Sequence, residues 1–145
     1  MAQRFRRTPM NQVLLPPVIG KNSEVFANGT PVTIDGSGFL AGCTSSGEKV
    51  YGFCIEDKTC ASDNQTVAKY CPQVVSPLDV EMEITTATIA QTDVGEYADV
   101  ATNTSGVVVM ANPGATGQFL LCEIIDSTTG VYKVAEPQQF AFAQS

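Results

Sequence analysis

Apolar and polar residues alternate along several short stretches of this chain, and the alternation is clearest in residues 79–89. There Met82 and Ile84 are flanked by Glu81 and Glu83. A side-chain period of two is typical of a β-strand with one face on the core and one face toward solvent. We therefore expect a half-buried antiparallel strand whose acidic outer row faces water.

Residues 28–57 predict three further strands in succession. The first alternates apolar and polar residues, and residues 35–38 (Asp-Gly-Ser-Gly) tolerate the positive φ angles that let a chain reverse. Residues 49–57 are rich in β-branched and aromatic side chains, which favour strands. Gly52 lies inside this last strand, where a glycine often marks a bulge or a close approach of another backbone segment.

The rest of the chain continues the same pattern of short apolar runs and turn-forming residues. We interpret residues 58–64 as a loop and residues 91–95 as one helical turn at most. Further strands are expected at residues 23–27, 65–70, 97–100, 107–110, 118–125, 131–134 and 138–142. Roughly eight to ten short strands predict an all-β fold, a small antiparallel sandwich or barrel-like domain.

Charge divides the 145 residues into two parts, although the length favours a single folded domain. All fifteen acidic residues lie in residues 23–145, which we expect to form one β domain. Residues 1–22 are basic and contain Pro16-Pro17, so we expect an extended N-terminal arm. Such an arm suits docking on a neighbouring subunit, and a frayed terminus is the alternative.

Several classes of partner are disfavoured by the same features. An acidic body does not suit nucleic-acid binding, because phosphate contacts need lysine and arginine. No apolar run reaches the ~18 residues of a membrane span. Leu14-Leu15 runs directly into Pro16-Pro17, so we expect no signal peptide.

Candidate catalytic or metal-binding groups are few. The chain has no histidine, so a Ser–His or Cys–His nucleophile pair is absent. Glu81 and Glu83 could act in acid–base chemistry or bind calcium, but on a solvent-facing row they are better interpreted as a wet surface. Asp93, Glu96 and Asp99 lack the spacing of a calcium loop. We expect no enzyme activity, no cofactor and no metal.

The five cysteines admit two interpretations. Cys43, Cys54, Cys60 and Cys71 are separated by ten, five and ten residues, without a CxxC motif. Disulfides among these four are possible outside a reducing cytosol. The alternative is that they are small buried apolar residues, because free cysteine is among the most buried residue types. Cys122 lies in an apolar run and is not expected to pair.

Two segments resemble head decoration (cement) proteins of tailed bacteriophages. Residues 29–40 read Gly-Thr-Pro-Val-Thr-Ile-Asp-Gly-Ser-Gly-Phe-Leu, and residues 50–57 read Val-Tyr-Gly-Phe-Cys-Ile-Glu-Asp. They are similar to the family's pattern of Gly-x-Pro-Val, a short hydrophilic turn and a later Val-x-Gly. Residues 83–100 resemble phage structural proteins in which an alternating strand leads into Asp-x-Gly-x-x-x-Asp-apolar. The resemblance covers residues 23–135.

This resemblance implies a structural virion protein, made in the host cytoplasm, that binds the outer capsid surface as a homotrimer. It would stabilise contacts between subunits of the major capsid protein. Gly52 is the candidate for a contact between subunits. In the arm, the large apolar side chains are expected to anchor the interface. The arm residues expected to contact the capsid are Arg4, Arg6, Arg7, Val13, Leu14 and Leu15. The alternatives are a tail tube or fibre domain, and a secreted β-rich adhesin or carbohydrate-binding module, against which the absence of tryptophan counts.

Overall fold

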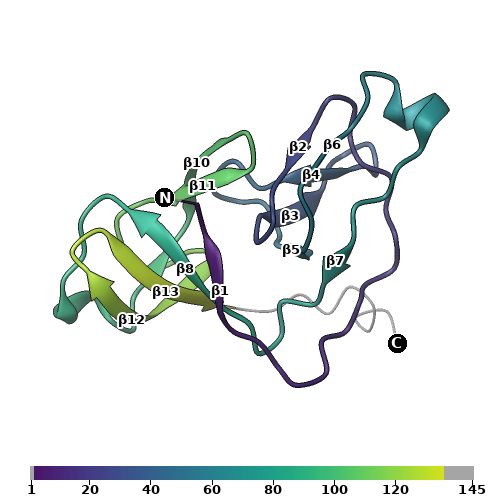
Figure 1. Cartoon of the computed structure of the whole chain (residues 1–145). Coiled ribbons are helices and arrows are strands. Elements are labelled where there is room, and N and C mark those ends of the chain that lie inside the picture. The colour runs from purple at the N-terminus through teal and green to yellow at the C-terminus, as the bar shows by residue number, and fades with distance from the viewer. Residues whose placement is uncertain (1, 136–145) are drawn as a thin grey trace.

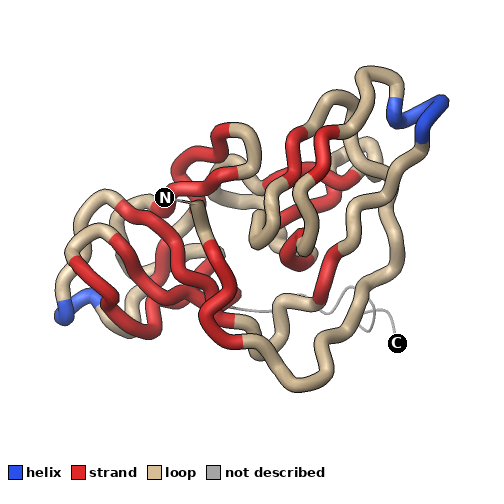
Figure 2. The backbone as a smooth tube through the Cα atoms, viewed as in Figure 1, coloured by secondary structure: helices blue, strands red, loops and turns tan. Residues whose placement is uncertain are grey.

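The computed structural model describes residues 2–135 and is built almost entirely of β-strands (Figure 1). Strands account for 41% of the residues and helices for 5%. Figure 2 shows two groups of strands, which we call the barrel lobe and the second lobe, with a short helical turn at each far end. The predicted all-β, barrel-like fold is confirmed.

The barrel lobe is a seven-stranded sheet that nearly closes on itself. Its strands run in the order β10-β11-β8-β13-β12-β9, and β1 also pairs with β8. Only Asp99 separates β9 from β10, so one bent segment pairs with β12 at its start and with β11 at its end. The strands are β1 (Arg4–Arg7), β8 (Glu81–Thr86), β9 (Tyr97–Ala98), β10 (Val100–Thr104), β11 (Val107–Met110), β12 (Phe119–Asp126) and β13 (Thr129–Val134).

The second lobe contains a four-stranded sheet in the order β4-β3-β5-β7 and the two-stranded pair β2-β6. Its strands are β2 (Val25–Phe26), β3 (Pro31–Ile34), β4 (Leu40–Gly42), β5 (Gly52–Cys54), β6 (Lys58–Thr59) and β7 (Val74–Val75). The predicted reversal between β3 and β4 is confirmed. Asp35 Oδ1 accepts hydrogen bonds from the backbone N–H groups of Ser37 (2.8 Å) and Phe39 (3.0 Å), and Gly38 takes a φ of 89°.

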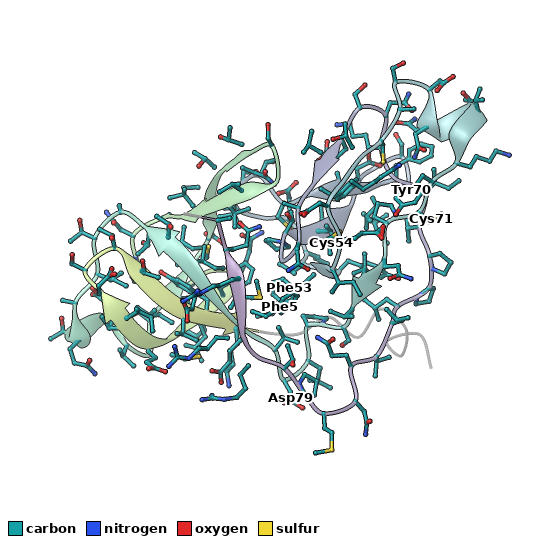
Figure 3. All side chains as sticks on the ribbon, in the orientation of Figure 1. Phe5, Phe53, Cys54, Tyr70, Cys71 and Asp79 are labelled. Carbon is teal, nitrogen blue, oxygen red and sulfur yellow. The ribbon has the colours of Figure 1, made fainter. Side chains whose placement is uncertain are left out.

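Aromatic side chains join the two lobes into one core. Phe53 of β5 is fully buried and lies between Phe5 of β1, at 6.2 Å between ring centroids, and Phe119 of β12, at 6.3 Å. Phe119 in turn contacts Tyr132 of β13 edge-to-face at 6.5 Å. Figure 3 shows Phe5 and Phe53 side by side between the lobes. These rings belong to one buried cluster that both lobes share, and the second lobe has a further buried cluster of its own around Phe26, Val32 and Leu40.

The prediction of a strand at residues 65–70 was wrong, since Asn64–Ala68 forms one π-helical turn, η1. The buried Asn64 side chain explains the difference: its Nδ2 donates to the carbonyls of Gly20 (2.7 Å) and Tyr70 (3.0 Å), and its Oδ1 accepts from the Tyr70 N–H (2.7 Å). Local side-chain bonds of this kind compete with strand formation. The predicted loop at residues 58–64 is also wrong in part, because Lys58–Thr59 pairs with β2.

The helical turn expected near residue 91 is confirmed as a 3₁₀ turn, η2 (Gln91–Asp93). Its start is capped by Asp93 Oδ2, which accepts from the Ala90 N–H at 2.8 Å. The strand expected at residues 138–142 lies outside the described residues.

Candidate functional site

The N-terminal segment is the most distinctive surface feature, and its first part is anchored on the barrel by ion pairs. Arg4 Nε lies 2.9 Å from Glu83 Oε1, and Arg6 Nη1 lies 3.0 Å from Glu83 Oε2. Glu83 is only 5% exposed. The interpretation of Glu83 as part of a wet acidic row is therefore wrong, because β1 covers this part of β8 and supplies two cations to its carboxylate.

Two further pairs extend these contacts to more exposed positions. Arg7 Nη1 lies 2.7 Å from Glu81 Oε1, and Arg6 Nη2 lies 3.3 Å from Glu123 Oε2. A register shift between Phe5 and Arg7 makes Arg6 the extra residue of a β-bulge. A bulge re-aims a side chain, and here it frees Arg6 to reach carboxylates on both β8 and β12.

These contacts determine the ionisation of the buried Glu83 carboxylate. The hydrogen bond from Arg4 is the largest cause that holds the pKa of Glu83 below its ordinary value, with the Arg6 hydrogen bond acting in the same direction. Burial opposes them, because desolvation disfavours the charged form. Since the arginines outweigh burial, Glu83 is ionised at neutral pH.

Gln3 anchors the start of the same segment in the barrel lobe. Its side chain is 3% exposed, with Nε2 donating to the Gly106 carbonyl at 2.9 Å and Oε1 accepting from the Val108 N–H at 3.0 Å. Nothing in the sequence indicates this role, since a glutamine next to a chain terminus is usually solvated. We call Gln3, Arg4, Arg6 and Arg7, with their partners, the β1 clasp.

The next residues leave the barrel and cross to the second lobe. Met10 is 98% exposed, and residues 11–12 are exposed as well. The chain then runs beside β7, where the Leu15 N–H donates to the Val74 carbonyl at 2.9 Å and the Ser76 N–H donates to the Val13 carbonyl at 2.8 Å. Residues 13–15 thus extend the four-stranded sheet beyond β7.

Large apolar side chains remain exposed along this crossing. Val13 is 53% and Leu14 is 58% exposed, whereas Leu15 packs against the core of the second lobe. Leu78, which is 45% exposed, follows Ser76, the residue that is bonded to Val13. We call Met10, Val13, Leu14 and Leu78 the apolar edge. Leu15, which was predicted as a third capsid contact, therefore packs inward, while its neighbours Val13 and Leu14 stay exposed.

Gly52 makes the close approach that its position predicts, and the approach is within the chain. A Cβ at this position would lie 2.4 Å from the Val75 carbonyl oxygen and 2.6 Å from Val74 Cγ1. The absence of a side chain thus lets β5 and β7 pack together. A role for Gly52 in contacts between subunits stays a prediction, and it would act through β7 because Gly52 itself is buried.

All five cysteines are free thiols in the structure. Cys43, Cys54 and Cys60 are buried, whereas Cys71 and Cys122 are partly exposed. Burial raises the pKa of the Cys54 thiol to about 11. Figure 3 shows Cys54 and Cys71 in the second lobe, with Cys71 beside Tyr70, whose hydroxyl donates to Glu56. The burial of three of the four candidates fits the interpretation as small apolar residues.

Two of the remaining acidic candidates, Asp93 and Asp99, have structural roles. Asp93 caps η2, and Asp99 Oδ1 accepts from the Gln118 N–H at 3.0 Å. Among residues 2–135, no three His, Cys, Asp or Glu side chains are grouped so that they could hold a metal ion. In the same part of the chain, no helix is long and apolar enough to cross a bilayer.

An open groove of about 510 Å³ lies on the surface between the two lobes. Glu48 and Lys49 line one side, and Tyr97 and Gln118 line another. Gln118 Nε2 donates to the carbonyls of Ser45 (3.1 Å) and Glu48 (2.6 Å), so it ties the loop before β5 to the barrel lobe. Its Oε1 accepts from the Val100 N–H at 2.9 Å within the barrel lobe, so only Nε2 joins the lobes.

A scan against protein-family models, a search of curated proteins and a search of solved structures each found no match to this chain.

Proposed function

We propose that this protein is a structural component of a phage virion that binds the outer surface of the head. There it stabilises contacts between neighbouring subunits of the major capsid protein. The sequence pattern of residues 29–57 and 83–100 supports this proposal, and so does the compact all-β fold in which both segments form strands.

The apolar edge is the observation that carries the proposal. Its side chains are large, apolar and between 45% and 98% exposed. Removing such apolar surface from water is the dominant favourable contribution to most protein–protein association. Val13 and Leu14 are held beside β7 by backbone hydrogen bonds, so binding would immobilise little additional chain. Preorganisation of this kind lowers the entropic cost of association.

The arginines of the arm have a smaller part in this proposal than their number suggests. Arg4, Arg6 and Arg7 already face three carboxylates of the same chain, so the cluster is close to neutral. The side chains of Arg4 and Arg7 are nevertheless 67% and 64% exposed. They keep unused N–H donors that can meet acceptor groups at the rim of an interface, where single charged contacts contribute about 0.2–1 kcal/mol each.

Binding of this kind stabilises a shell through mass action. A protein that binds only the assembled, expanded head shifts the equilibrium toward that state, by about 2.7 kcal/mol per site at a concentration 100 times Kd. The mechanism needs complementary surface at repeated positions and no chemical step.

The experiment is cosedimentation with expanded, undecorated heads, assembled from the major capsid protein that is encoded with this chain. Leu14→Asp places a charge at an exposed position of the apolar edge, and we expect it to weaken binding at least tenfold. Val67→Asp is the matched control, because Val67 is 73% exposed but belongs to η1, away from the apolar edge. Equal binding by both variants would remove the apolar edge from the proposal.

The homotrimer is part of the same proposal and has its own measurement. Size-exclusion chromatography with light scattering would give three times the mass of one chain. A hexameric ring would favour the tail-tube alternative, and a monomer at all concentrations would favour an adhesin or carbohydrate-binding module.

A further inference from the structure

We propose that β1 is an exchangeable strand, which docks on β8 of a second copy of this chain when copies are held close together. This inference goes beyond the proposed function and does not rest on it, because it concerns only contacts of the chain with itself.

Every anchor of β1 lies far away in the sequence. Gln3 binds Gly106 and Val108, while Arg4 and Arg6 share Glu83. The side-chain contacts of the β1 clasp span between 25 and 117 residues of sequence. Since the clasp does not depend on the residues that follow it, the same site on another copy would offer the same hydrogen bonds, ion pairs and strand pairing.

The site fits one kind of occupant closely. Its carboxylates at Glu81, Glu83 and Glu123 are matched by three arginines on a four-residue strand. Phe5, between those arginines, fills a position beside Phe53. Charge complementarity and shape therefore select the N-terminal strand of this chain, its own or that of a second copy.

The connection between β1 and the second lobe has the properties of a hinge. No hydrogen bond joins residues 9–12 to another described residue, and residues 10–12 are exposed. Pro9 disfavours a helical conformation of Thr8, and so favours an extended course over a tight turn. The chain is fixed again at Val13 by its bond with Ser76. Figure 1 shows it leaving the end of β1 and running along the lower edge to β7.

Chain length sets how far the strand can reach. If β1 is released while Val13 stays bound, the connecting residues 8–12 extend over at most roughly 17–18 Å. The site on β8 of a second copy must therefore lie within this distance of Val13, which requires the two copies to be in direct contact. Exchanging an identical element between protomers is a low-cost route to an oligomer, because the strand makes the same hydrogen bonds and ion pairs on either copy.

The concentration of the protein determines whether β1 docks on its own chain or on a second copy. A strand tethered by a short linker has an effective concentration on the order of millimolar at its own site. Isolated chains in dilute solution therefore keep β1 closed, whereas chains that are crowded or docked side by side exchange it.

A disulfide trap distinguishes the two arrangements. Arg7 and Glu81 are opposite each other in the β1–β8 register, and opposite Cα atoms in antiparallel pairs are about 4.5–5.5 Å apart, within the range that a disulfide bridges. The variant is Arg7→Cys/Glu81→Cys in a Cys71→Ser/Cys122→Ser background, which removes the partly exposed native thiols. It keeps Gln3, Arg4 and Arg6 as anchors.

The variant is refolded and oxidised at low-micromolar and at near-millimolar concentration, and the products are separated without reductant and weighed by intact mass. We expect single chains with an internal disulfide in the dilute sample, and covalently linked chains in the concentrated one. The Arg7→Cys chain alone, in the same background, measures random cross-linking. Internal disulfides alone at every concentration, or linked chains no more abundant than in this control, would overturn the proposal. Head binding is not used in the readout, so this test can fail while the proposed function stands.

Discussion

Replacing Glu83 by glutamine tests whether the β1 clasp holds the N-terminal strand on the barrel. Glutamine has nearly the shape of glutamate, so the core around Met82 and Ile84 stays filled. The substitution removes the negative charge that Arg4 and Arg6 share at 2.9 and 3.0 Å, and it leaves one side-chain oxygen as a neutral acceptor.

The expected loss follows from the exposure of the partners. Hydrogen bonds to charged groups contribute about 1.5–3 kcal/mol each, but the Arg4 and Arg6 side chains are 67% and 36% exposed and can return to water. We expect a loss of about 2 kcal/mol in the free energy of unfolding, which corresponds to roughly 4–8 °C in Tm for a domain of this size. Glu81→Gln, the matched control, breaks only the exposed pair with Arg7 and should cost about 0.2–1 kcal/mol.

The pH dependence gives a second readout of the same interaction. Because the pKa of Glu83 is lowered in the folded state, the folded protein binds fewer protons here than the unfolded chain does. The stabilisation is therefore complete above about pH 4.5, the ordinary value for a glutamate, and is lost as the pH falls through the lowered pKa. Chemical denaturation of wild type, Glu83→Gln and Glu81→Gln between pH 3 and 7 would measure it. Two results would refute the clasp. One is an equal loss of unfolding free energy in both variants, and the other is a difference between wild type and Glu83→Gln that stays the same from pH 7 to pH 3.

Three further outcomes follow from the packing. Gly52→Ala should destabilise the fold by about 1–3 kcal/mol through overpacking against β7, whereas Gly36→Ala, where a Cβ meets no atom within 4 Å, should stay within about 0.5 kcal/mol of wild type in thermal unfolding. Phe53→Ala should lower the free energy of unfolding by about 3–5 kcal/mol. It should preserve a single unfolding transition, since both lobes share its cluster, and two separated transitions in calorimetry would contradict the shared core. A thiol reagent at pH 8 should react with Cys71 and Cys122 well before the three buried cysteines, and rapid labelling of all five in the native protein would show that the second lobe opens.

The strands that could be predicted from the sequence are those whose pattern is local. The alternation around Met82, the reversal at residues 35–38 and the apolar run before Asp126 all depend on neighbouring residues, and each forms the expected element. The strand predicted at residues 65–70 failed because Asn64 bonds the backbone of Tyr70 nearby and also that of Gly20, and the second contact spans 44 residues and leaves no local signal.

The candidate site shows the same limit more strongly. The sequence indicates that Leu14 is apolar and near a terminus, but not that Leu15 turns inward while Leu14 stays exposed. The strand predicted from the alternation around Glu83 was correct, but the prediction that Glu83 faces water was wrong. Its side chain is covered by β1, whose arginines lie 77 to 79 residues earlier in the sequence. Such long-range pairings leave no periodic signal in either segment.

The most direct test of the central claim is to image expanded, undecorated heads by electron microscopy after incubation with the purified protein. We expect added density at repeated positions on the outer surface, with the apolar edge of each copy facing the shell, and loss of that density for Leu14→Asp but not for Val67→Asp. Heads that gain no ordered density at saturating concentrations of the wild-type protein would contradict it.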